Sequence, residues 1–119
     1  MRLEKKRSDS PDEVRPMADK GHVDILNIGD GVVGVATFQP GWRWSEHVKP
    51  IAGTDSCQAA HLGYVISGRQ KILMDDGSEL EFAAGDVVAI PPGHDGWVVG
   101  DEPCVVVDFA GMGEYAKAS

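Results

Sequence analysis

A glycine, a short apolar run and two prolines lead directly to a histidine in the segment 85–94, which reads GDVVAIPPGH. The glycine allows a tight turn into the segment. The β-branched run Val87–Ile90 has the length of a strand, and we expect it to be buried on both faces. The prolines fix the backbone where the strand ends. The segment therefore predicts a rigid turn that carries His94 at the end of a buried strand.

Short apolar segments alternate with turn signals through the rest of the chain. Gly29-Asp30-Gly31 and Asp76-Gly77 are typical of β-hairpin turns. We expect strands over residues 23–28, 32–39, 42–49, 58–67, 71–75, 79–82, 87–90 and 104–109. Strands at this spacing favour an all-β fold, either a double-sheet antiparallel jelly roll or an immunoglobulin-like sandwich.

Two motifs resemble those of the cupin superfamily. The pattern of Gly85, Pro91 and Gly93 resembles the second cupin motif. Five residues separate Gly41 from His47, as at the start of the first cupin motif, and His61 takes the place that a glutamate usually has in it. The resemblance covers about residues 23–112 and implies a small single-domain cupin-like barrel rather than a sandwich.

The metal motifs depart from the usual cupin pattern. Lys49 stands where the first motif has its second histidine, and eleven residues lie between it and His61, a longer gap than is usual. In the second motif, His94 directly follows the glycine, and Gly96 holds the customary histidine position. The metal motifs are therefore atypical.

The ends of the chain lie outside the expected barrel. Residues 1–22 are polar and predict an arm, in which Ser10, Pro11 and Glu13 indicate one helical turn. Residues 113–119 are expected to form a C-terminal tail. The arm, a barrel over 23–112 and the tail together make a single domain.

Composition and charge exclude several classes of partner. A net charge of −8 argues against a nucleic-acid partner. No segment has the length of apolar sequence that a transmembrane helix needs, and the basic start lacks the apolar stretch of a signal peptide. We therefore expect no membrane association and a cytoplasmic location. Cys57 and Cys104 do not have the spacing of a metal-binding or redox CxxC motif and predict no disulfide framework.

Three histidines are candidate metal ligands. The resemblance places His47, His61 and His94 in or beside the metal motifs, and imidazole is a common ligand of divalent metals. If the three converge, they could hold iron, zinc, nickel or manganese. Glu46, Asp95 and Asp108 are carboxylates that could complete such a site. The alternative is that each histidine is an ordinary polar residue at a strand end or pocket rim.

Alternation over residues 42–49 suggests a ligand pocket. A strand there would place Trp42 and Trp44 on one face and Arg43, His47 and Lys49 on the other. If the polar face turns inward, it favours a small acidic ligand, and the tryptophan face is then free to join two copies of the chain as a homodimer. The candidate pocket residues are Arg43, Lys49, Cys57, Asp95 and Trp97.

Two functions remain open at this point. One is a cupin-like protein that binds a small polar or acidic ligand through a divalent metal, as an enzyme or otherwise. The other is a metal-free, non-catalytic sensory or binding module in which the same histidines line the pocket. The fold resemblance does not choose a reaction.

Overall fold

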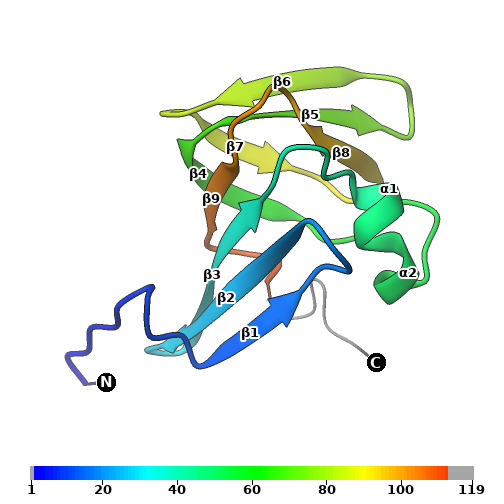
Figure 1. The fold of residues 1–119 in the computed structure, drawn as a ribbon. Coiled ribbons are helices and arrows are strands. Elements are labelled where there is room, and N and C mark those ends of the chain that lie inside the picture. Colours follow the sequence, from blue (N-terminus) through cyan, green and yellow to red (C-terminus); the bar gives the residue numbers. More distant parts are fainter. Residues whose placement is uncertain (1, 113–119) are drawn as a thin grey trace.

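The computed structural model describes residues 2–112, so the tail expected over 113–119 lies outside the described residues. Within that range the chain forms two antiparallel sheets and two short helices (Figure 1). The elements are β1 (Glu13–Pro16), β2 (Gly21–Ile28), β3 (Gly31–Phe38), α1 (Trp44–His47), α2 (Lys49–Ala52), β4 (His61–Ser67), β5 (Arg69–Met74), β6 (Glu79–Ala83), β7 (Val87–Ile90), β8 (His94–Val98) and β9 (Cys104–Asp108). The predicted all-β fold is therefore confirmed.

The two sheets enclose one core. The larger has the strand order β1-β2-β3-β9-β4-β7, and the smaller has the order β6-β5-β8. No pairing of named strands in the described range joins one sheet to the other, so the sheets face each other without closing into a continuous hydrogen-bonded barrel. Inward residues of both sheets, among them Val65, Val106 and Ile72, form the hydrophobic core between them.

The structure contains both of the β-hairpins that the turn sequences predicted. β2 and β3 pair around Gly29-Asp30, and β5 and β6 pair around Asp76-Gly77. The strand expected over residues 58–67 is also present as β4, and its side chains alternate between exposed and buried. Leu62, Tyr64 and Ile66 are exposed, whereas Gly63 and Val65 are buried and His61 is largely buried on the opposite face.

The predicted strand over residues 42–49 is wrong, because α1 and α2 occupy most of this segment. Trp44, His47 and Val48 are buried. Their spacing places them on one face of a helical turn. Trp42 and Trp44 are each only 2% exposed, so they belong to the core and cannot provide the outward face expected for a homodimer.

Three further strand predictions need correction. Glu13–Pro16 is a strand paired with β2, and not a helical turn of a free arm. Asp95 and Trp97 lie in β8, a strand that is not among those expected from the sequence. β7 is an edge strand whose Val87 is 73% exposed, so it is not buried on both faces.

None of the described helices has the length and apolar character required to cross a membrane.

Candidate functional site

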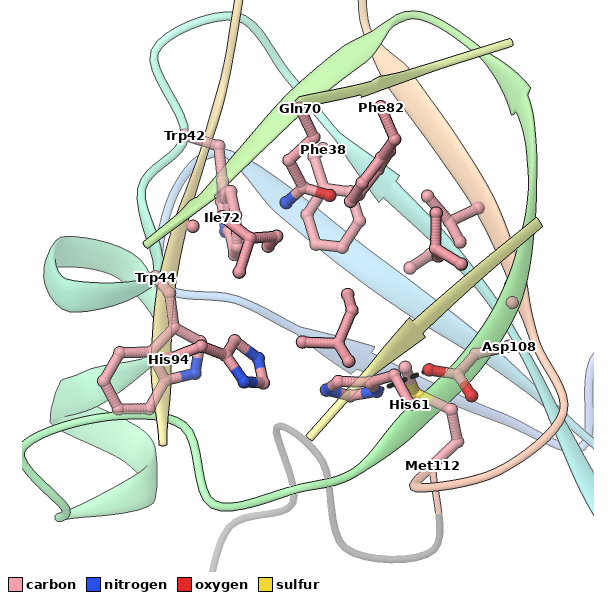
Figure 2. Close-up of a pocket in the computed structure, with 16 residues that line it drawn as sticks. Phe38, Trp42, Trp44, His61, Gln70, Ile72, Phe82, His94, Asp108 and Met112 are labelled. Carbon is pink, nitrogen blue, oxygen red and sulfur yellow. Dashed lines mark hydrogen bonds and ion pairs between the residues drawn. The ribbon is translucent and has the colours of Figure 1, made fainter. Parts of the chain in front are cut away.

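A cysteine and two histidines meet at one place between the sheets. Ligand atoms of Cys57, His61 and His94 all lie within 4.8 Å of one another. Sγ of Cys57 is 3.7 Å from Nε2 of His61. The two imidazole rings meet edge to face with their centroids 5.4 Å apart (Figure 2). This group, which we call the Cys-His-His cluster, offers one sulfur and two nitrogen donors to a single point.

Each sheet contributes one histidine to the cluster. His61 begins β4 in the larger sheet, and His94 begins β8 in the smaller. Cys57 lies in the loop before β4 and is tied to His94 by an isolated β-bridge, in which its backbone N–H donates to the His94 carbonyl at 2.7 Å. The cluster is therefore a product of how the two sheets pack.

Hydrogen bonds fix the orientation of both histidines. Nδ1 of His61 lies 2.5 Å from Oδ2 of the buried Asp108. Nδ1 of His94 donates to the backbone carbonyl of Pro91 at 2.8 Å. Because an acceptor holds Nδ1 in each ring, Nε2 of each ring is the nitrogen that can act as a ligand.

The cluster also shifts two pKa values. Burial alone would raise the pKa of the Cys57 thiol, but hydrogen bonds with His61 and His94 outweigh it and lower the pKa from 9.0 to about 6. Burial would lower the pKa of His61, but the Asp108 and Cys57 contacts raise it from 6.5 to about 9. At neutral pH and without a bound metal, the pair is therefore a thiolate and an imidazolium.

A cavity opens beside the cluster. It contains about 510 Å³ of space not filled by protein atoms, part of it open to solvent. Its wall is mostly aromatic and aliphatic, and polar side chains occur at both ends (Figure 2). The aromatic and sulfur-containing side chains in this wall are Phe38, Trp42, Trp44, Phe82 and Met112. The polar ones are His61, Gln70, His94 and Asp108. The cavity has the character of a small-molecule site.

His47 does not join the Cys-His-His cluster. It lies at the end of α1, where its Nδ1 accepts a hydrogen bond from the backbone N–H of Arg43 at 3.0 Å. The expectation that His47 meets His61 assumed a strand over residues 42–49. His47 instead ends a helical turn, and its side chain is not part of the cluster.

The other predicted pocket residues lie in three different places. Cys57 belongs to the cluster. Arg43, Asp95 and Trp97 form a group of their own outside the cavity wall, with the Arg43 guanidinium 4.3 Å from the centre of the Trp97 ring and 3.9 Å from Asp95. Lys49 pairs at 3.7 Å with the exposed Asp55.

Sequence reasoning missed the roles of Gln70, Trp42 and Trp44 in the cavity wall, and it named Asp108 only as a possible ligand. Alternation along β9 places Cys104, Val106 and Asp108 on one buried face, and that signal was present in the sequence. Gln70 follows the same alternation with the buried Ile72 in β5. A polar residue inside an apolar alternating run could therefore have identified both.

Comparisons with known proteins agree with this architecture. The family model described as "EutQ-like cupin domain" matches residues 47–106. No curated protein matches the chain. Among solved structures, a DUF1255 protein of unknown function from Acidithiobacillus ferrooxidans superposes with a TM-score of 0.61 at 18% identity, covering 84% of this chain and 88% of that one.

Oxalate decarboxylases also share the fold. The Bacillus subtilis enzyme gives a TM-score of 0.55 at 23% identity and covers 81% of this chain. The Lactobacillus farciminis enzyme, solved as a formate complex, gives 0.58 at 21% identity and covers 86%. This chain spans only 27% and 32% of those two longer chains, respectively, so the similarity concerns the fold of one domain.

Proposed function

Because the chain belongs to the cupin superfamily, with a EutQ-like cupin domain over residues 47–106, we propose that it binds a small molecule in its cavity through a divalent metal ion. Cys57, His61 and His94 are the proposed ligands. The observation that carries this proposal is the hydrogen bonding of the two Nδ1 atoms, that of His61 to Asp108 and that of His94 to the Pro91 carbonyl. With Nδ1 engaged, Nε2 is the nitrogen of each ring that can bind a metal.

The donor set fits a metal of intermediate softness. One thiolate and two imidazoles favour zinc or iron over manganese, which prefers oxygen ligands. Two such donors on one tetrahedral ion lie about 3.5 Å apart, close to the 3.7 Å between Sγ of Cys57 and Nε2 of His61. The Bacillus subtilis oxalate decarboxylase has Mn(II) centres, so the thiolate would distinguish this site from that one.

A metal held there would act as a Lewis acid toward an oxygen or nitrogen atom of the bound molecule. The protein's own groups would position that molecule. The aromatic wall of the cavity would shield that molecule from water, and Asp108 would keep the proton of His61 on Nδ1, away from the proposed ligand atom.

A second candidate is a metal-free binding module. One observation favours it: Asp108, His61 and Cys57 form a hydrogen-bonded chain in which each charge already has an opposite charge beside it. Such an arrangement satisfies the buried groups without an ion. Metal content distinguishes the two functions.

The test is the metal content of protein purified without chelators, measured by elemental analysis. We expect close to one equivalent of zinc or iron per chain, and a large loss in Cys57→Ser, His61→Ala and His94→Ala. His47→Ala and His22→Ala are matched controls and should retain the metal, since neither side chain belongs to the cluster. Metal-free wild-type protein that takes up no zinc or iron on titration would instead favour the binding module.

The protein also has a surface suited to self-association, and we propose that it is a homodimer through the outer face of β4 and β7. Tyr64 on β4 pairs with Val87 on β7 and with Val107 on β9, and Leu62 and Ile66 are about half exposed on the same face of β4. A contiguous apolar face of this kind is typical of a protein interface. The cytoplasmic location stays a prediction.

A further inference from the structure

One polar side chain stands out in the apolar wall of the cavity. Gln70 on β5 is only 5% exposed and lines the cavity. Its side-chain amide makes no hydrogen bond to residues 2–112, and it reaches the cavity space instead of being fully closed off from it. Buried amides are normally hydrogen-bonded, because an unpaired one loses its water partners without compensation. Because its amide reaches the cavity, Gln70 is available to form hydrogen bonds with a molecule bound there.

The surroundings of Gln70 differ from those of the Cys-His-His cluster. Figure 2 shows the Gln70 amide beside Phe38 and Phe82, at the end of the cavity away from His61. The indole N–H groups of Trp42 and Trp44 are also buried without an acceptor among residues 2–112. The cavity wall thus carries unpaired donors together with one amide that can both donate and accept.

The charge of the cavity limits what can bind at this end. No lysine or arginine belongs to the described lining, and Arg43 and Lys49 pair with carboxylates elsewhere. A carboxylate buried against Phe38 and Phe82 would have no cation beside it, and an uncompensated buried charge is costly. The earlier expectation of an acidic ligand depended on Arg43 and Lys49 facing the cavity, so its basis is lost.

We propose that the cavity binds a neutral molecule with an amide-like edge, a carbonyl beside an N–H, and that Gln70 recognises that edge through paired hydrogen bonds. The aromatic side chains hold the apolar or planar body of the molecule. This proposal deepens the function proposed above, because it assigns a ligand class to the same cavity. It is independent of which metal the cluster holds.

The test compares three probes of similar size: benzamide, benzoate and toluene. Binding to the wild-type protein is measured by ligand-observed NMR titration. We expect benzamide to bind at least about tenfold more tightly than benzoate, because benzoate would bury a charge with no cation beside it. Gln70→Leu should weaken benzamide binding by about tenfold or more and leave toluene binding unchanged or stronger.

A stability measurement provides a second readout. Gln70→Leu should not lower the thermal midpoint of the ligand-free protein, because the change removes no hydrogen bond between the amide and residues 2–112. Gln39→Leu is the matched control, since Gln39 is exposed and lies outside the cavity wall; it should change neither benzamide binding nor the midpoint. Equal affinities for benzamide and benzoate, no saturable benzamide binding, or an unchanged benzamide affinity in Gln70→Leu would overturn the proposal.

The metal proposal can fail separately. Gln70→Leu should keep the metal, and Cys57→Ser should lose the metal while still preferring benzamide over benzoate. If Gln70→Leu loses the preference for benzamide over benzoate and no variant contains metal, the amide-edge site is supported and the metal centre is rejected.

Discussion

The Nδ1 atom of His61 lies 2.5 Å from the Oδ2 atom of Asp108, and both side chains are buried. The two residues come from neighbouring strands, β4 and β9, in which Gly63 is the direct partner of Asp108. This contact fixes the ring of His61 and orients its Nε2 toward Cys57. Buried carboxylate and imidazole groups at this distance form a charge-assisted hydrogen bond. Several of the predictions below depend on it.

Asp108→Asn should weaken metal binding without removing a proposed ligand. The amide cannot hold a full negative charge against Nδ1–H of His61, and loss of such an outer partner typically costs 10- to 100-fold in metal affinity. Competition with a chelator measures the affinity. Asp95→Asn is the control and should change it little, because Asp95 bonds to the Ser45 backbone and lies outside the cluster. Equal affinities in the wild-type and Asp108→Asn proteins would contradict the role assigned to Asp108.

In chelator-treated protein, Cys57 should titrate as an unusually acidic thiol. Its pKa of about 6 means that the thiolate is present at pH 7 and is lost only as the pH falls through about 6. Cys104 should stay protonated, because burial raises its pKa to about 12. Ultraviolet thiolate absorbance against pH, with Cys57→Ala subtracted, measures the titration.

Two results identify the source of that acidity. His61→Ala should move the Cys57 transition upward toward the ordinary thiol value of 9.0, since it removes the hydrogen bond that lowers the pKa. A transition that stays near pH 9 in the otherwise unaltered protein would argue against the ion pair.

Tyr64→Lys should convert the expected dimer into a monomer. Tyr64 is 44% exposed between Val107 and Val87, and a lysine there would place a charge in the centre of the proposed interface. Light scattering gives the mass in solution. Val14→Lys is a suitable control, because Val14 is 54% exposed but lies on β1 at the opposite edge of the sheet. A monomeric wild-type protein at high concentration would reject the interface.

Gly68→Ala should destabilise the fold by at least about 2 kcal/mol. Gly68 has φ of 78°, and a Cβ there would lie 2.3 Å from the Pro103 carbonyl oxygen. Gly77→Ala shares the positive φ but meets nothing within 4 Å, so it should cost only about 1 kcal/mol. Denaturant unfolding of both variants separates the steric clash from the backbone strain.

The hairpins and the inward face of β4 could be predicted from the sequence because they depend on local chemistry. Gly29-Asp30 and Asp76-Gly77 supply the backbone conformations that tight turns need, and the polar and apolar alternation around His61 fixes which side of the strand turns inward. The cupin resemblance rested on Gly85, Pro91 and Gly93 together with the partial first motif that begins at Gly41, and the family match agrees with it.

The segment after Gly41 shows where local patterns fail. Trp42, Trp44 and Val48 follow the alternation of a strand, and Trp44 and Val48 also follow the spacing of a helix. Both patterns bury the same side chains, so hydrophobic periodicity alone could not choose between them. In the folded protein this segment forms α1, which packs against β8. His47 lies at the end of this helix and is not part of the cluster with His61.

The sequence by itself determined the all-β class, the hairpin turns and the inward direction of His61, because each depends on residues close together in the chain. The tertiary structure decided that Cys57, His94 and Asp108 meet His61, since these residues come from a loop and from strands in two different sheets. It also decided that the Gln70 side chain lines the cavity. Contacts of that kind depend on strand order and sheet packing, which local spacing does not encode.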